Sequence, residues 1–152
     1  MPKIDIARCV TRTTSTYPGD FGKVTVGREK TALGNAAGLT QFGVNLTRLK
    51  PGAGSALRHW HESEDEFVYV LEGEATLIDD AGETVLRAGE CAGFKAGEPN
   101  GHCLVNRSDH DVVYLEVGTR SPTDRYHYPD VDLAGEKDEK GVRFTRKSGE
   151  PC

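Results

Sequence analysis

Two histidines separated by one residue are the feature of this sequence best suited to chemistry. His59 and His61 flank Trp60, and an acidic run over 62–66 follows them. Residues i and i+2 of an extended strand point to the same face, so the two imidazoles would lie side by side. Neutral imidazole is the commonest metal ligand in proteins. The pair predicts part of a metal site, although two histidines on a surface would satisfy the same pattern.

A carboxylate and a third imidazole could complete such a site. Glu66 opens an apolar segment, and a hairpin between this segment and the histidine segment would bring its carboxylate beside the two imidazoles. The acidic residues at 62, 64 and 65 could also serve, but a solvated bend is expected there. His102 is the candidate for the fourth ligand, whereas His110 and His127 lie in polar segments and are expected to face solvent.

Three imidazoles and one carboxylate favour a first-row divalent ion, such as manganese, iron, nickel or zinc, over calcium or magnesium. On a six-coordinate ion, four protein ligands leave two positions for water or substrate. The same four ligands would close a four-coordinate zinc, which would then be structural. The sequence therefore predicts one divalent transition metal ion and leaves its identity open.

The segments that must position these residues have the pattern of an all-β protein. Apolar and small or polar residues alternate over 42–47, and turn residues such as Pro51 and Gly52 follow. No segment keeps an apolar helical period over three turns. Short strands separated by turns are typical of a sandwich or barrel. The expected strands cover residues 42–47, 66–71, 75–78, 84–86, 91–94, 102–105 and 112–117.

The two ends of the chain lack this pattern. The stretch before about residue 38 and the tail over 119–152 are different in character, and the tail is polar. A solvated loop is expected over 135–140, where charged residues cluster. Tyr126, Tyr128 and Phe144 favour docking of the tail on the barrel, with a partly ordered tail as the alternative.

Length, composition and net charge further restrict the class of protein. The chain has 152 residues and a net charge of −5, which predicts one domain over 1–152 and argues against a nucleic-acid partner. Its apolar runs are too short to span a bilayer, and no secretory signal is evident, so a cytoplasmic protein is expected. The four cysteines are scattered and are expected to be free thiols, with Cys91 and Cys103 buried.

The segment from Gly52 to Gly73 is similar to the first motif of the cupin superfamily. Its spacing is His59-x-His61-x4-Glu66-x6-Gly73. The second cupin motif matches less closely, because a lysine stands where proline is usual and the gap before the histidine is two residues longer. Its matching residues are Gly89, Gly97, His102 and Asn106.

The resemblance implies a double-stranded β-helix, or jelly-roll barrel, with a core over about 40–117. It also implies His59, His61, Glu66 and His102 as metal ligands, and a homodimer. Apart from the resemblance, strand parity predicts that Arg58 points out of the barrel to a surface or interface, and that Trp60 packs between sheets or subunits. Tyr69 is expected in the core.

Within the cupins, the sequence resembles most the small single-domain bacterial proteins called sugar-phosphate-isomerase-like. The segments that carry this resemblance are 57–74, 104–108, 114–120 and 128–133. This group implies a metal-dependent enzyme acting on a small oxygen-rich metabolite, with Glu66 as the first candidate for the catalytic base. Two alternatives stay open: an iron-dependent dioxygenase, and a non-catalytic module that binds a small molecule.

Overall fold

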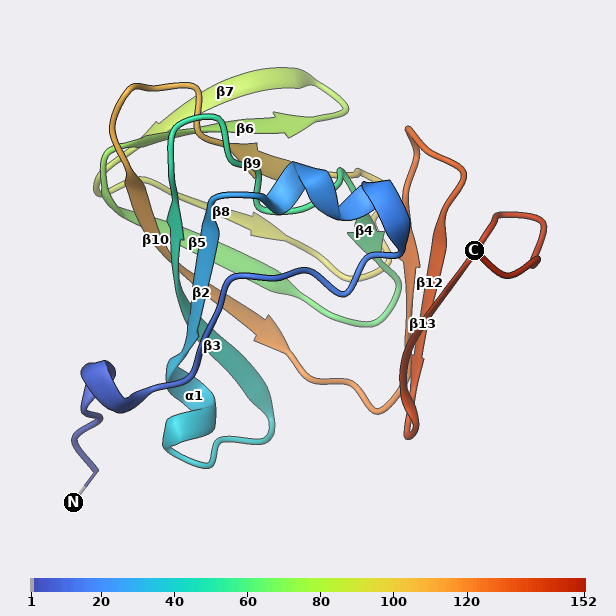
Figure 1. The fold of residues 1–152 in the computed structure, drawn as a ribbon, viewed down its shortest axis with the longest axis horizontal. Helices are drawn as coiled ribbons and strands as arrows, with labels where there is room; N and C mark the ends of the chain where they lie inside the picture. The colour runs from blue at the N-terminus through green and yellow to red at the C-terminus, as the bar shows by residue number, and fades with distance from the viewer. Residues whose placement is uncertain (1) are drawn as a thin grey trace.

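The structure, a computed structural model, describes residues 2–152 and consists mainly of short strands (Figure 1). The helical segments are η1 (Ile6–Arg8), η2 (Gly19–Thr25) and α1 (Leu33–Ala36). The strands are β1 (Thr11–Arg12), β2 (Arg28–Ala32), β3 (Phe42–Leu49), β4 (Trp60–His61), β5 (Glu66–Glu72), β6 (Glu74–Asp79), β7 (Gly82–Arg87), β8 (Cys91–Phe94), β9 (Cys103–Val105), β10 (Val112–Thr119), β11 (Asp124–His127), β12 (Ala134–Asp138) and β13 (Gly141–Thr145).

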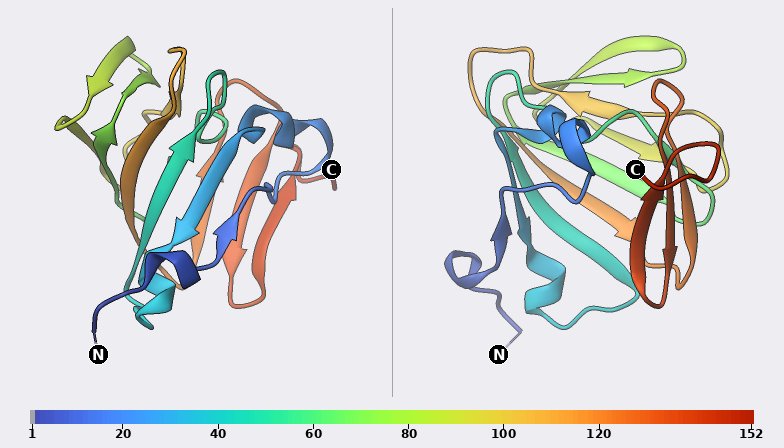
Figure 2. Two further views of the ribbon diagram at one scale, coloured as in Figure 1. Left: turned by 60° about the vertical axis from the view of Figure 1, so that its left-hand side comes forward. Right: turned by 45° about the vertical axis from the view of Figure 1, so that its right-hand side comes forward.

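The strands form three antiparallel sheets, and residues of two of them make up the hydrophobic core. The largest has the order β1-β2-β3-β10-β5-β8, and a smaller one has the order β7-β6-β9. Residues of both sheets meet in the core, which includes Leu49, Val70, Leu104 and Tyr114. The third sheet, β13-β12-β11-β4, joins the C-terminal tail to the strand that carries His61. Figure 2 shows the orange and red strands of the tail beside the rest of the barrel. This arrangement confirms the expected double-stranded β-helix.

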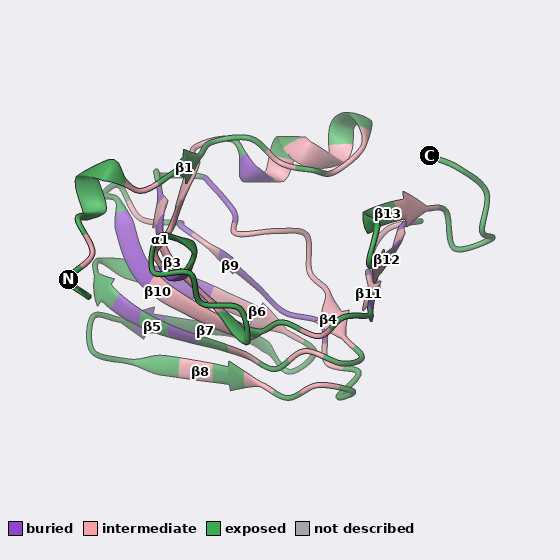
Figure 3. Cartoon of the chain, turned by 90° about the horizontal axis from the view of Figure 1, so that it is seen from below, coloured by how far each residue is buried: buried purple, intermediate pink, exposed green. Residues whose placement is uncertain are grey.

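Alternation along β5 shows how the sequence sets the inner face. Val68 and Val70 are buried, whereas Phe67, Tyr69 and Leu71 are 42%, 39% and 41% exposed. Successive strand residues point to opposite faces, so a row of valines fixes which side meets the core. Figure 3 shows the buried stretches on β5 and β10.

The same alternation corrects two expectations. Tyr69 is not a core residue, because its parity is opposite to that of the buried valines. Cys91 is exposed rather than buried, because it pairs with Tyr69 and so shares the outer face. Cys103 is buried as expected, and the four cysteines are free thiols.

The tail forms a hairpin rather than the solvated loop expected over 135–140. There β12 pairs with both β11 and β13. Charged side chains pair across it: Arg143 Nη1 lies 2.6 Å from Asp138 Oδ2, and its Nη2 lies 3.3 Å from Glu136 Oε2. Lys137 pairs with Glu64 in the acidic bend. Opposite charges on facing strands thus give a polar segment regular structure.

Arg58 anchors the tail on the opposite side of the histidine segment. Its guanidinium forms two hydrogen bonds to Asp130, of 2.9 and 2.8 Å, and pairs with Asp80 in the β6–β7 turn. These hydrogen bonds raise the pKa of Arg58, although burial opposes the shift. The side chain is only 17% exposed, so the expected outward-facing arginine is a connector within the chain. Among residues 2–152, none of the helices is long and apolar enough to cross a membrane.

Candidate metal centre

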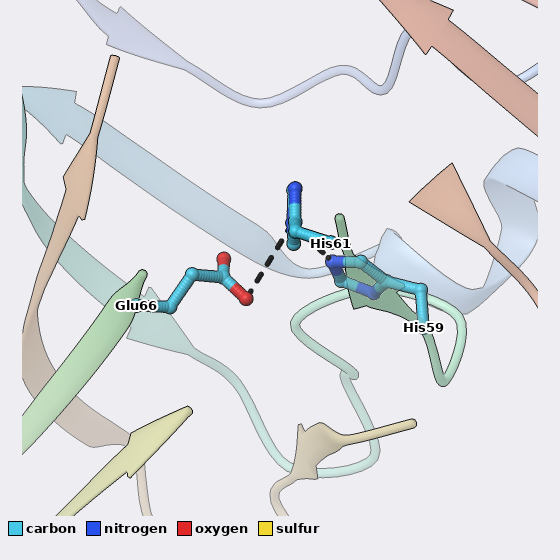
Figure 4. A group of neighbouring side chains, drawn as sticks. All are labelled: His59, His61 and Glu66. Atoms are coloured by element: carbon cyan, nitrogen blue, oxygen red, sulfur yellow. Dashed lines mark hydrogen bonds and ion pairs between the residues drawn. The ribbon is translucent and has the colours of Figure 1, made fainter. Parts of the chain in front are cut away.

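Three of the side chains selected from the sequence converge at one end of the barrel (Figure 4). Possible ligand atoms of His59, His61 and Glu66 all lie within 4.8 Å of one another. The Nε2 atoms of the two histidines are 3.1 Å apart, and His61 Nε2 lies 3.5 Å from Glu66 Oε2. Two nitrogens at about 2.1 Å from one ion, at right angles, would be about 3 Å apart. The spacing therefore suits two ligands of a single ion.

Hydrogen bonds determine which ring nitrogen of each histidine carries a hydrogen and which one could bind a metal ion. His59 Nδ1 lies 2.7 Å from the carbonyl oxygen of Leu57, and His61 Nδ1 lies 2.6 Å from Asp124 Oδ2. Carbonyl and carboxylate oxygens only accept, so each Nδ1 must carry a hydrogen. In the neutral rings the lone pairs are then on the Nε2 atoms, which face each other. An outer acceptor that fixes the tautomer in this way is the usual support of a metal-bound histidine.

His102, the residue before β9, reaches the same carboxylate. Its Nε2 lies 2.6 Å from Glu66 Oε2, and its ring stacks on Phe94 with a centroid distance of 3.5 Å. The backbones of His59 and His102 also pair, through hydrogen bonds of 3.2 and 2.9 Å. The structure thus brings together all four residues selected from the sequence. His102 lies outside the group of three and is joined to it through Glu66.

Charge in this cluster favours a bound cation. Burial lowers the pKa of His59 to about 4, so this ring is neutral. Burial opposes the ionised form of Glu66, yet hydrogen bonds from His102 and His61 hold its pKa well below the ordinary value. Burial also opposes a charge on His61, but Glu66 and Asp124 raise its pKa to about 9. Without a metal, a protonated His61 supplies the positive charge between two carboxylates.

Asp124 is the functional residue that sequence reasoning missed. Its side chain is fully buried; Oδ2 accepts from His61, and Oδ1 accepts a 2.8 Å hydrogen bond from the Ser63 amide. Asp124, His61 and Glu64 form a second group that could hold an ion. The alternation of Asp124 and Tyr126 in β11 could have indicated an inward-facing residue, but not its contact with His61. Glu64, expected in a solvated bend, is instead nearly buried at this site.

The cluster opens on a cavity of about 680 Å³. His59, His61 and Glu66 line it, together with Tyr126 and Tyr128 of the tail. Burial raises the pKa of both tyrosines, so they stay protonated. A cavity of this size, with a few polar groups at one end, is typical of small-molecule sites.

A double-stranded β-helix with histidines and a glutamate at one end defines a class of metal-binding barrels. The cupin domain family matches residues 45–118. A solved structure from Silicibacter pomeroyi, named as a sugar phosphate isomerase of the cupin superfamily, is 50% identical over 99% of this chain and 96% of that chain, with a TM-score of 0.96. The chain belongs to the cupin superfamily.

Two further relatives are more distant. A provisionally named sugar phosphate isomerase from Acidithiobacillus ferrooxidans is 25% identical, with a TM-score of 0.80 over 97% of this chain and 91% of that chain. An oxalate-binding protein from Thermotoga maritima is 33% identical over 70 residues, which are 46% of this chain. The match spans only 55% of that protein.

Proposed function

We propose that this cupin is a metal-dependent isomerase of a small, oxygen-rich metabolite, with sugar phosphates as the substrate class. The observation that carries the proposal is the cluster of imidazole and carboxylate groups opening on a cavity of about 680 Å³. The Silicibacter pomeroyi protein, named as a sugar phosphate isomerase and similar along nearly the whole chain, supports it. The proposal treats residues 1–152 as one domain; a cytoplasmic location stays a prediction.

The proposed ligands of one divalent manganese, iron, nickel or zinc ion are His59, His61, Glu66 and His102. Their donor atoms suit such an ion: Nε2 of the neutral His59 faces Nε2 of His61, and Glu66 is ionised. The Nε2 atoms of His61 and His102, which donate hydrogen bonds to Glu66, would become ligands when their protons are displaced by the ion. A bound ion would act as a Lewis acid that polarises substrate oxygens.

The chain's own groups would hold the substrate and move its protons. Glu66 Oε2 is held by His102 and His61, and its lowered pKa suits a ligand better than a base. We keep Glu66 as the candidate base, although the lowered pKa applies to the whole carboxyl group and makes either oxygen a weak base. Tyr126 and Tyr128 wall the cavity; the protonated phenol of Tyr126 can donate a hydrogen bond to a substrate oxygen, whereas that of Tyr128 donates to Tyr17.

Elemental analysis followed by turnover assays tests this function. Wild-type protein is expected to carry about one divalent transition ion per chain and to interconvert an aldose and a ketose phosphate, as monitored by NMR. Chelation should abolish turnover, and re-addition of the ion should restore it. His110→Ala, at an exposed position outside the cavity, is the matched control. Metal-loaded protein that turns over no member of a broad aldose and ketose phosphate panel contradicts the proposal.

A non-catalytic module that binds a small acid is the second candidate. The relative named as an oxalate-binding protein from Thermotoga maritima favours it, because it is 33% identical over 70 residues. Oxalate binding by calorimetry without any turnover would support this candidate. Oxygen uptake by the iron-loaded protein would instead indicate a dioxygenase.

We also propose a homodimer, as expected from the family resemblance. Trp60 does not supply its surface, because its ring stacks on His127 of the same chain at a centroid distance of 4.2 Å. The outer face of the large sheet is the better candidate, since Phe67, Tyr69 and Leu71 stand in one exposed apolar row. Light scattering is expected to give about twice the 16.5 kDa chain mass. A monomer would contradict this assembly and leave the metal proposal unaffected.

A further inference from the structure

The wall of the cavity formed by β2 carries positive charge. Arg28 and Lys30 alternate with outward-facing residues, and both line the cavity. Lys30 pairs in register with Thr47 of β3, which pairs with Tyr114 of β10. A row of polar groups therefore crosses the inner face of the large sheet. None of its members belongs to the proposed metal ligands.

Arg28 differs from Lys30 and Lys137 in its partners, and it shares the lack of a carboxylate partner among the described residues with Arg12 and Arg120 of the same cavity lining. Lys30 Nζ lies 2.6 Å from Glu116 Oε1, and Lys137 pairs with Glu64. Arg28 donates instead to two neutral carbonyl oxygens, those of Ser55 at 2.6 Å and Thr14 at 3.4 Å. Among residues 2–152 no carboxylate forms an ion pair with it. Its charge is therefore held in place by the backbone without being neutralised.

Arg28 also has unused hydrogen-bonding capacity. Its Nε is buried and has no hydrogen-bond partner among the described residues. The guanidinium has five N–H donors in a planar fork, a geometry that matches two oxygens of a phosphate or carboxylate. Backbone carbonyls occupy only part of this set.

Tyr114 supplies a second polar group on the same cavity wall, two strands away on β10. The residue is fully buried, and neither its hydroxyl nor that of its cross-strand neighbour Thr47 has a hydrogen-bond partner of normal geometry among the described residues. Burial and the charge of Glu116 raise the pKa of Tyr114, while Arg28 and Thr47 lower it. Arg28 and Tyr114 thus both face the same cavity. A buried hydroxyl without a partner is uncommon in proteins and points to a ligand.

We propose that Arg28 and Tyr114 form a subsite for an anionic group, phosphate or carboxylate, of the small molecule that this cavity binds. The subsite is distinct from the metal cluster, and the idea that one substrate spans both rests on the proposed function. The segment between them is shared: Arg28 binds the carbonyl of Ser55, and His59 binds that of Leu57. A substrate with an anionic group at one end and chelating oxygens at the other end would fit the anion subsite and the proposed metal site together.

Titration of the metal-free protein with inorganic phosphate tests the subsite without requiring metal or turnover. Calorimetry should show binding to wild type, and Arg28→Gln should weaken it about tenfold or more, whereas Arg28→Lys retains part of it. Arg48→Gln is the matched control, because Arg48 lies on the outer face of the same sheet and pairs with Asp111. Acetate forms the second arm: tighter phosphate binding identifies a phosphorylated substrate, and tighter acetate binding identifies a carboxylic acid.

Arginine-side-chain NMR provides a readout in wild type that does not depend on how the Gln variant folds. The Nε–H signal of Arg28, assigned with Arg28→Lys, is expected to shift on addition of phosphate or acetate, while that of Arg48 stays in place. Absence of a shift with either anion overturns the subsite. Equal phosphate affinities of wild type and Arg28→Gln overturn it as well. Neither result would affect the metal proposal, which stands or falls on elemental analysis and turnover.

Discussion

Two histidine–carboxylate pairs lie on opposite faces of the short β4–β11 ribbon and differ mainly in burial. Inside, His61 Nδ1 lies 2.6 Å from Asp124 Oδ2; outside, His127 Nε2 lies 2.7 Å from Glu62 Oε1. The Asp124 side chain is fully buried, whereas both members of the outer pair are 40% exposed. Nearly equal distances therefore join pairs in different surroundings.

The distance between the partners therefore does not by itself determine how much such a pair contributes to stability. Water screens an exposed pair, so its contribution to the free energy of folding is small. Burial strengthens the interaction and makes the loss of one partner costly, because the other polar group is left unpaired. Only the inner pair can orient a proposed metal ligand, since Asp124 fixes the proton on the nitrogen of His61 that faces away from the cluster.

The two pairs are expected to differ most in their effect on metal retention. His61→Ala should abolish it, because one of four proposed ligands is lost. His127→Ala, which removes an imidazole from the outer face of the same ribbon, should retain wild-type metal. Elemental analysis of both variants after dialysis provides the measurement. Equal metal content in the two would remove His61 from the proposed ligands.

Replacement of the acceptor rather than the ligand should have a smaller effect. Asp124→Asn leaves all four proposed ligands in place but weakens control of the His61 tautomer. Metal affinity is expected to fall about 10- to 100-fold, the usual effect of losing such a support. Glu62→Gln is the matched control and should leave affinity unchanged. Competition with a metal indicator measures both, and an unchanged affinity in Asp124→Asn would count against the supporting role.

Stability of the metal-free protein should also separate the pairs. Asp124→Ala leaves His61 and the Ser63 amide without their acceptor, and the expected loss is about 3–5 kcal/mol. Glu62→Ala, at the exposed pair, should cost about 0–1 kcal/mol. Denaturant unfolding with a chelator present measures the free energies. Similar losses would mean that burial does not distinguish the two pairs.

The smallest expected difference is in the pH dependence of this stability. Burial opposes the charge, but Glu66 and Asp124 raise the pKa of His61 from 6.5 to about 9. The folded state then holds a proton more tightly than the unfolded state. The resulting stability is fully present below pH 6.5 and is lost as the pH rises to 9.

The free energy of unfolding of the metal-free protein should therefore fall less between pH 6.5 and 9 in Asp124→Asn than in wild type. Glu62→Gln should follow the wild-type curve. Parallel curves for wild type and Asp124→Asn would exclude Asp124 as a cause of the raised pKa.

The strands with apolar inner faces could be predicted from sequence. Residues 91–94 were predicted with the bounds of β8, and 42–47 recovered most of β3. The strand β2 was missed because its inner positions are Arg28 and Lys30, which line a cavity rather than the core. A binding surface needs polar groups where a core strand has apolar ones, so the pattern fails there for a functional reason.

The candidate site was predictable where its residues are close in sequence. Strand parity and family spacing selected His59, His61 and Glu66, and the structure places them in one group. Asp124 could not be assigned to the site, because its contact depends on the pairing of β11 with β4. That pairing brings together residues 63 positions apart, and no local pattern in the histidine segment specifies it.

The contribution of the tail to the His61 site sets an order of events during synthesis. The chain leaves the ribosome from its N-terminus, so His59, His61 and Glu66 emerge well before Asp124, and contacts between such distant segments form late in folding. A nascent barrel whose tail has not docked would hold a metal ion weakly. Binding of the proposed ion is thus expected to follow synthesis and docking of β11, which makes the pairing of β11 with β4 the step that completes the proposed site.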